Sequence, residues 1–326
     1  MTESASYSNE VILVARVGAN AGQLQVTKFP CGVTDNALVI NAKEWNDYIY
    51  YFLQYYNLNR LVFGSGQPLI TGGMLKKIKV MHGVKSERNK ITRLLGLMDE
   101  RIATQDKIIE KLETLIKGLA DTLLDNPLWE KTYLRSFMQF FSTNSLSWEQ
   151  LSYEEGVIRN LHYGLIHGFQ ASGIGSMSLP KIRQNAIPKQ YTLCQIGDVA
   201  FADASEDTSE IGKSVEFVDT IDSETVCGLH TIHGRDVKDK TFVGFKGFAF
   251  NSRYFHNQVK RLAQGTKVFS ITANNLSSCY IYLPDMAEQR TITGLLYTYE
   301  NQISISRKLL QQLKIQKKYL LQHMFI

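Results

Sequence analysis

Long apolar runs and paired cysteines are both missing from this chain of 326 residues. No apolar run reaches the roughly 18 residues that a membrane-spanning helix needs. The opening Met1-Thr2-Glu3-Ser4 lacks the basic-then-apolar pattern of a secretion signal. No Cys-x-x-Cys pair occurs among the four cysteines, which are Cys31, Cys194, Cys227 and Cys279. We therefore expect a cytoplasmic protein without disulfides, whose cysteines are buried as small hydrophobic residues.

Catalytic signatures are also missing. Ile211-Gly212-Lys213-Ser214 is similar to the end of a phosphate-binding loop, but Asp207 stands where that loop needs a glycine. Asn126-Pro127 lacks the second proline with which amino-methyltransferases hold a flipped base, and no glycine-rich donor-binding turn precedes it. We therefore expect that the chain is not an enzyme and binds no cofactor itself.

One group of residues in the sequence is spaced like the ligands of a metal site. Cys227, His230 and His233 have ligand-like spacing. They make three candidate ligands at most, with no obvious fourth, and alternating side chains of a strand explain two of them without an ion. The prediction is therefore no metal.

An internal repeat is the most specific feature of the sequence. Two long stretches without internal proline, Ser86 to Asp125 and Ala287 to Phe325, predict helices. In the first, apolar residues recur at alternating spacings of four and three, which is a heptad seam, and adding 201 to each position gives a second seam. The seam positions that we expect at a spacer or subunit interface are Ile91, Leu95, Ile102, Ile109, Leu112, Leu119, Ile292, Leu296, Ile303, Leu310, Leu313 and Leu320. About 39 residues at ~1.5 Å each make a rod of roughly 58 Å, which can hold two globular units apart.

The repeat extends upstream of the helices, where Gly64 and Ile70 recur at the same offset as Gly265 and Ile271. Copy two also has a stretch from Asn126 to Ile196 that copy one lacks, so we expect copy one to be incomplete. The predicted division is 1–85, a partial globular domain; 86–125, a helix; 126–285, a complete globular domain; and 286–326, a second helix.

The globular parts are predicted to be rich in strands, which makes the fold class α+β. Short helices are expected from Glu44 to Tyr56 and from Ser252 to Ala263. Apolar runs bounded by turn residues predict strands at Val11 to Val17, Ala37 to Ile40, Val199 to Ala202, Val215 to Val218, Gly247 to Phe250 and Val268 to Thr272.

The charge leaves nucleic acid open as a partner: 36 Lys and Arg against 31 Asp and Glu give a net +5, which permits a polyanion without requiring one. Basic residues in copy two are scattered among aromatic ones, a mixture that suits phosphate contacts and base-edge contacts, although any solvated face carries lysines. The run from His162 to His167 combines donors, an aromatic ring and a glycine, although a plain strand and turn is the simpler interpretation. The residues predicted to contact DNA are His162, Tyr163, Lys181, Arg183, Lys213, Lys246, Arg253 and Lys260.

A globular unit, a long helix, a second globular unit and a repeat-related helix make an arrangement that resembles the specificity subunit of a type I restriction-modification enzyme. The motifs that carry the resemblance are His162-Tyr163-Gly164-Leu165-Ile166-His167, Gly197-Asp198-Val199, Ile211-Gly212-Lys213, Glu288-Gln289-Arg290-Thr291-Ile292 and Leu320-Leu321-Gln322-His323-Met324-Phe325. The resemblance covers nearly the whole chain, apart from an N-terminal recognition domain that we expect to be truncated.

The resemblance implies strand-rich target recognition domains separated by two antiparallel coiled-coil spacer helices. Each domain would read one half of a bipartite site in double-stranded DNA. The implied partners are methyltransferase subunits, which use S-adenosylmethionine, and a restriction motor-nuclease subunit. Because copy one is incomplete, we expect that a second specificity chain or fragment completes the first recognition domain, or that two copies assemble through their helices. Two alternatives stay open from the residues alone: a coiled-coil scaffold or assembly protein without a DNA role, and a self-sufficient methyltransferase or nuclease.

Overall fold

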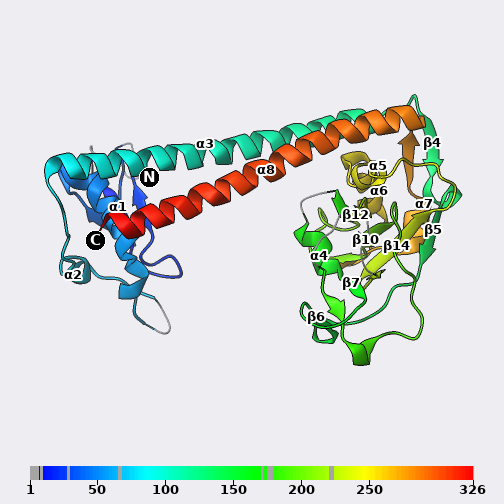
Figure 1. The fold of residues 1–326 in the computed structure, drawn as a ribbon, viewed down its shortest axis with the longest axis horizontal. Helices are drawn as coiled ribbons and strands as arrows, with labels where there is room; N and C mark the ends of the chain where they lie inside the picture. The colour runs from blue at the N-terminus through cyan, green and yellow to red at the C-terminus, as the bar shows by residue number, and fades with distance from the viewer. Residues whose placement is uncertain are drawn as a thin grey trace. The chain divides into compact units, whose positions relative to one another are not determined.

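The computed structural model describes residues 7, 10–27, 30–64, 68–169, 172–174, 179–219 and 224–325. The chain forms two compact units: unit 1 comprises Met1–Ile109 and Ile305–Ile326, and unit 2 comprises Glu110–Ser304. Two long helices, α3 (Lys85–Leu124) and α8 (Met286–Met324), contribute residues to both units (Figure 1). Among the described residues, no helix is both long and apolar enough to cross a membrane.

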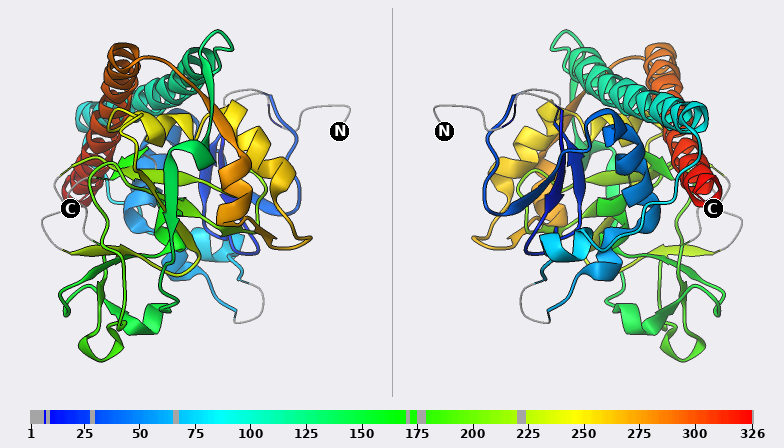
Figure 2. Two further views of the ribbon diagram at one scale, coloured as in Figure 1. Left: turned by 90° about the vertical axis from the view of Figure 1, so that its right-hand side faces the viewer. Right: turned by 90° about the vertical axis from the view of Figure 1, so that its left-hand side faces the viewer.

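Unit 1 is built on a small antiparallel sheet of order β2-β1-β3, with β1 at Ile12–Ala15, β2 at Leu24–Val26 and β3 at Ala37–Ile40. Helix α1 (Asn46–Tyr56) lies beside this sheet (Figure 2, right). A 3-10 turn at Lys43–Trp45 leads into α1, and Asn57, at φ 58°, ends it in the left-handed conformation. A second 3-10 turn (Leu58–Leu61) and the short α2 (Gly72–Leu75) complete the unit. Its core joins the sheet and α1 to Leu95 of α3 and to Phe325, which directly follows α8, and Leu320 of α8 packs against it.

Unit 2 contains a five-stranded sheet of order β5-β14-β10-β12-β8, in which only the β12–β8 pair is parallel. A four-stranded sheet has the order β13-β7-β9-β6, and the pairs β16-β4 and β11-β15 are two-stranded. The strands are β4 (Glu130–Tyr133), β5 (Met138–Phe141), β6 (Leu151–Ser152), β7 (Arg159–Leu161), β8 (Gly173–Ile174), β9 (Lys181–Ile182), β10 (Val199–Ala202), β11 (Ala204–Ser205), β12 (Ser214–Phe217), β13 (Thr225–Cys227), β14 (Thr231–Asp236), β15 (Phe269–Ser270) and β16 (Tyr280–Leu283). The helices are α4 (Tyr163–Gly168), α5 (Phe245–Ala249), α6 (Arg253–Leu262) and α7 (Ala273–Ser278), with 3-10 turns at Leu134–Ser136, Trp148–Gln150 and Gln184–Ala186.

The central strand β10 separates two hydrophobic cores of unit 2. Val199 and Phe201 pack into one core, whereas Ala200 and Ala202 pack into the other. Successive side chains of a strand point to opposite faces, so a strand that is covered on both faces is apolar throughout, as Val199–Ala202 is. The first of these cores also takes in Ile292 and Leu296 of α8, with Leu119 and Leu123 of α3 packed against it.

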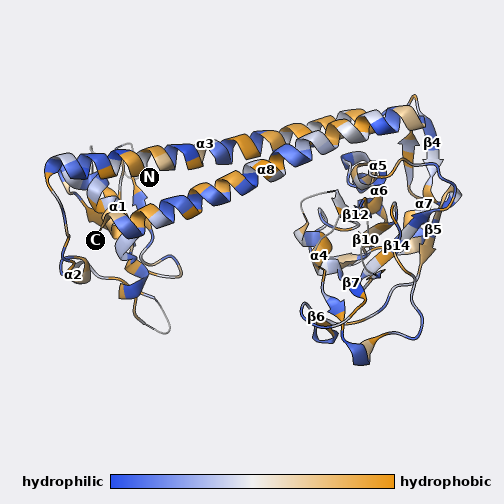
Figure 3. Cartoon of the chain, in the orientation of Figure 1, coloured by the Kyte–Doolittle hydropathy of each residue, from blue (hydrophilic) through white to orange (hydrophobic). Residues whose placement is uncertain are grey.

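Burial along both long helices follows the heptad spacing. None of the twelve predicted seam residues is exposed, and apolar residues recur among hydrophilic ones along both helices (Figure 3). Within unit 1 the two helices run antiparallel, because Asp99 pairs with Lys317 while the later Gln105 pairs with the earlier Ser306. The polar side chains Gln105 and Lys317, which interrupt the apolar seams, both have polar partners. Gln105 Nε2 donates to the Ser306 carbonyl oxygen at 3.4 Å, and Lys317 Nζ lies 2.5 Å from Asp99 Oδ1.

The α+β fold and both long helices agree with the sequence predictions, and so do the helices near Glu44 to Tyr56 and Ser252 to Ala263. The predicted strand at Gly247 to Phe250 is wrong, because this segment belongs mostly to helix α5. A short apolar run that is buried on all sides has no periodicity to distinguish a strand from a helix. The predicted strand at Val268 to Thr272 shrinks to Phe269–Ser270. The outermost predicted domain limits, at residues 1 and 326, lie outside the described residues.

Candidate nucleic-acid interface

His162 caps the helix that follows it. Its Nδ1 accepts a hydrogen bond from the backbone N–H of Gly164 at 3.2 Å, so the run from His162 to His167 is a cap and a helix rather than a strand and turn. The side chain is buried against the ring of Trp148, with ring centroids 4.4 Å apart. Burial lowers the pKa of His162, and the neighbouring His230 lowers it further. His162 is 3% exposed and is therefore not available for the DNA contact that the sequence predicted for it.

Tyr163 is more accessible and lies among imidazoles. Its ring centroid is 5.2 Å from that of His230 and 5.9 Å from that of His167, both edge-on. The exposed His230 has a φ of 54° and places Nδ1 3.1 Å from Asp203 Oδ1. Burial raises the pKa of Asp203, whereas His230 opposes this rise. We call Trp148, His162, Tyr163, His167 and His230 the Tyr163 cluster.

Trp148 and His230 were not among the predicted contacts. Trp148 lies 14 residues before His162 in the sequence, and His230 lies 67 residues after Tyr163. No local periodicity links such positions, because the strand pairing of unit 2 brings them together. A tryptophan followed by polar residues, Trp148-Glu149-Gln150, was the available signal for an exposed aromatic side chain.

Lys213 joins the Tyr163 cluster through His167. Its Nζ donates to the carbonyl oxygen of His167 at 3.1 Å and forms an ion pair with Glu210 Oε2, also at 3.1 Å. His167 Nδ1 lies 3.4 Å from the same carboxylate oxygen. The ammonium is thus fixed at the edge of the cluster, where part of it stays accessible.

Lys213 and Arg253 line one cavity of about 510 Å³ in unit 2, together with Lys117 and His256. Arg253 is exposed at the start of α6, and its backbone N–H donates to Asp121 Oδ1 at 2.9 Å. Burial lowers the pKa of His256, although its hydrogen bond to the Thr208 carbonyl oxygen opposes this effect. Lys260 is exposed near the other end of α6 and does not line this cavity.

Lys181 and Arg183 lie on or next to β9 in the four-stranded sheet. Lys181 is directly opposite Arg159 of β7, which puts two cations side by side on one face. Arg183 forms an ion pair with Glu155, and its Nε donates to the carbonyl oxygen of Glu149 at 3.1 Å. These side chains are partly accessible, so a basic patch on the two inner strands of the sheet is available to a phosphate backbone.

Lys246 is where the prediction of a DNA contact is wrong. Its residue exposure is 1%. The ammonium lies 2.9 Å from Glu216 Oε1 and donates to Thr241 Oγ1 at 2.7 Å, while the N–H of Gly247 donates to Glu216 Oε2 at 2.8 Å. Burial raises the pKa of Glu216, and Lys246 opposes that rise. This lysine neutralises an internal carboxylate and cannot reach a phosphate.

The family model of the type I restriction modification DNA specificity domain matches residues 3–114 and 222–315. The chain belongs to this family. Members of the specificity subunit family have a DNA-recognition role and are not catalytic, since partner subunits carry out the chemistry. Each matched segment ends within one of the two long helices. The intervening stretch, which the model does not match, carries five of the predicted contact residues, namely His162, Tyr163, Lys181, Arg183 and Lys213.

Relatives of this specificity subunit extend over nearly the whole chain. The type I restriction enzyme MjaVIII specificity subunit of Methanocaldococcus jannaschii is 24% identical over 331 residues, which cover 94% of this chain and 76% of the relative. The solved S subunit of a type I restriction-modification system from M. genitalium has a TM-score of 0.63 at 16% identity, covering 100% of this chain and 85% of that one. A chain from a structural study of assembly and conformational transition in the type I R-M system has a TM-score of 0.60 at 15% identity, covering 100% and 84%. Both likenesses concern the fold.

Proposed function

We propose that this chain is the subunit that reads the DNA sequence for a type I restriction-modification complex and directs methyltransferase and restriction subunits to a bipartite site. The observation that carries the proposal is the paired placement of accessible cations in unit 2: Lys181 beside Arg159 on one sheet, and Lys213 with Arg253 around one cavity. Lysine and arginine side chains held in fixed positions set the register of a protein on duplex DNA by contacting phosphates. The accessible Tyr163 and His230 lie next to the second group and are suited to contacts with base edges.

The experiment is a salt titration of duplex binding by the complex of this chain with its methyltransferase subunits. Two double variants, Lys181→Ala with Arg159→Ala and Lys213→Ala with Arg253→Ala, each remove one group of cations. Each phosphate contact that is lost should reduce the slope of log Kobs against log salt by about 0.9. Lys267→Ala is the matched control, since Lys267 is an exposed lysine of unit 2 outside both groups.

An unchanged slope in both double variants would contradict the assignment of these residues, and full affinity retained in molar salt would contradict DNA recognition itself. A coiled-coil scaffold without a DNA role would show neither salt dependence nor sensitivity to the variants. Lys246 is left unaltered in this experiment, because its replacement disturbs the interior of unit 2.

We also propose that the long helices dock the methyltransferase subunits through exposed apolar side chains. Leu94 and its repeat counterpart Leu295 are 39% and 42% exposed, and Ile108 and Leu309 are 42% and 44% exposed. Exposed apolar side chains recur at equivalent positions of the two repeats. This recurrence favours two equivalent docking surfaces as the explanation over chance exposure. S-adenosylmethionine is then bound by the docked subunits rather than by this chain.

Co-purification tests the docking. The pairs Leu94→Asp with Ile108→Asp, and Leu295→Asp with Leu309→Asp, should each reduce the number of bound methyltransferase subunits, and all four changes together should abolish binding. Leu128→Asp is the control, because Leu128 is 92% exposed and lies outside both helices. Undiminished binding by the fourfold variant would show that other surfaces dock the partners.

Sequencing of methylated bases in the host genome would show whether the recognised site is bipartite.

A further inference from the structure

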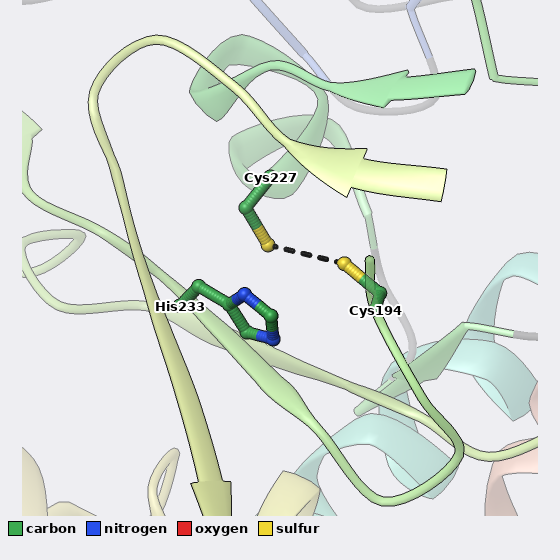
Figure 4. Close-up of side chains that lie close together, drawn as sticks. All are labelled: Cys194, Cys227 and His233. Carbon is green, nitrogen blue, oxygen red and sulfur yellow. Dashed lines mark hydrogen bonds between the residues drawn. The ribbon is translucent and has the colours of Figure 1, made fainter. Parts of the chain in front are cut away.

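Three potential metal ligands from separate segments of unit 2 converge in its interior. Cys194 lies in the loop before β10, Cys227 ends β13, and His233 lies on β14. All three residues are buried, and one ligand atom from each lies within 4.8 Å of the other two. Figure 4 shows the three side chains pointing toward one another. The three candidate metal ligands considered from the sequence included His230 in place of Cys194. His230 is exposed and is paired with Asp203.

The distance between the two sulfurs fits a metal better than a disulfide. Cys194 Sγ and Cys227 Sγ are 3.6 Å apart. Tetrahedral zinc, with Zn–S bonds of about 2.3 Å, places two thiolate sulfurs about 3.8 Å apart. A disulfide requires a sulfur separation of about 2.05 Å.

Asp198 and Arg235 orient the imidazole. The Nε2 of His233 donates to Asp198 Oδ2 at 2.7 Å, and Arg235 donates to both oxygens of the same carboxylate at 2.8 and 2.7 Å. A proton held on Nε2 leaves Nδ1 with a free lone pair, and one ring nitrogen faces the sulfurs (Figure 4). A histidine ligand held by a carboxylate in this way is the usual arrangement around a bound metal. The backbone N–H of Gln195 donates to Asp198 Oδ2 at 2.8 Å, which anchors the residue next to Cys194.

We propose that Cys194, Cys227 and His233 bind one Zn²⁺ ion as a tetrahedral centre, with a water molecule as the fourth ligand. A cavity of about 40 Å³ borders Cys227 and His233 and is lined also by Thr143 and Asn144. This volume holds one water molecule with polar neighbours. The ion would link the four-stranded sheet, through Cys227 on β13, to the five-stranded sheet, through His233 on β14.

The charges of the centre balance. Two thiolates and a neutral imidazole around Zn²⁺ carry no net charge, and Asp198 is neutralised separately by Arg235. Binding releases the two thiol protons to solvent, because zinc is coordinated by thiolates.

The test uses the full chain, purified under reducing conditions and passed over a chelating resin. Elemental analysis should find about one zinc ion per chain. Replacing the zinc by Co²⁺ should give the sulfur-to-cobalt charge-transfer absorption of two thiolates together with the visible bands of tetrahedral cobalt. The cobalt spectrum is measured on the unaltered chain, so it does not depend on the folding of any variant.

The variants Cys194→Ser, Cys227→Ser and His233→Asn should each weaken zinc binding at least 10-fold, whereas the control Cys279→Ser should retain it. Cys279 is also a buried cysteine, but it belongs to the other core of unit 2. Retention of stoichiometric zinc by the Cys194→Ser, Cys227→Ser double variant would overturn the proposal, as would a chain that takes up neither zinc nor cobalt. A thiol titration in denaturant that finds about two reactive thiols instead of four would overturn it in favour of a disulfide.

Discussion

The ammonium of Lys246 lies 2.9 Å from Oε1 of Glu216, and both residues are buried in unit 2. Removing one partner of a buried ion pair leaves an uncompensated charge in the interior, which costs about 3–5 kcal/mol. Lys246→Met should therefore lower the free energy of unfolding by about that amount, as measured by urea denaturation. The double variant Lys246→Met with Glu216→Gln should recover much of the loss.

Lys260→Met is the control for this pair, because Lys260 is exposed on α6. Equal effects of Lys246→Met and Lys260→Met would show that the buried pair is not formed in solution.

Lys317 interrupts an otherwise apolar seam, and its partners explain how the interruption is tolerated. Its ammonium pairs with Asp99 at 2.5 Å and lies 5.5 Å from the centre of the Tyr51 ring, while the Tyr51 hydroxyl donates to Asp99 Oδ2 at 3.0 Å. Lys317→Ala should destabilise unit 1 by about 1 kcal/mol, because this half-buried pair is held by a network. Lys314→Ala should change stability little, since Lys314 forms only an exposed 4.0 Å contact with Asp106. Thermal unfolding of the two variants makes the comparison, and a larger loss for Lys314→Ala would contradict the network.

His162 should make unit 2 sensitive to acid. Burial lowers its pKa from 6.5 in the folded state, so the unfolded chain takes up the proton first as the pH falls below about 6.5. Stability should therefore fall with falling pH through this range, by at most about 1.4 kcal/mol per pH unit for one proton. Protonation at Nδ1 would also remove the acceptor that caps α4.

His162→Asn separates this effect from others, since asparagine caps a helix and does not titrate. The variant should show a flatter dependence of the unfolding free energy on pH between about 7.5 and 5.5, measured by urea denaturation at each pH. His256, whose pKa is also lowered by burial, remains in both proteins and its contribution cancels. Parallel curves for the two proteins would mean that His162 is not the titrating group.

Two helical glycines should respond to alanine in opposite directions. A Cβ on Gly247 of α5 would lie 2.5 Å from the carbonyl oxygen of Ser172, whereas a Cβ on Gly294 of α8 would meet nothing within 4 Å. Gly294→Ala should stabilise the protein by about 0.5–1 kcal/mol through helix propensity. Gly247→Ala should destabilise it by about 1–3 kcal/mol, because the backbone contact leaves no room. Melting temperatures that shift in the same direction for both variants would contradict the packing around α5.

The sequence by itself determined the long helices, their seams and the repeat that relates them. Residues such as Ile91 and Leu95 are neighbours on a helix surface, so their spacing alone indicates which face is buried. The same periodicity placed Lys317 and Gln105 in the seam, and the family resemblance rested mainly on these segments. The expectation that the first recognition domain is incomplete stays a prediction.

Only the tertiary structure decided which polar side chains of unit 2 are accessible and which are internal. In the sequence, nothing distinguishes Lys246 from the other lysines that lie among aromatic residues. Its burial depends on the carboxylate of Glu216, which is 30 residues earlier in the chain. Cys194 became a neighbour of Cys227 and His233 through pairing of segments 33 and 39 residues away. Contacts at such separations depend on strand register and on the packing of whole sheets, which spacing along the chain does not encode.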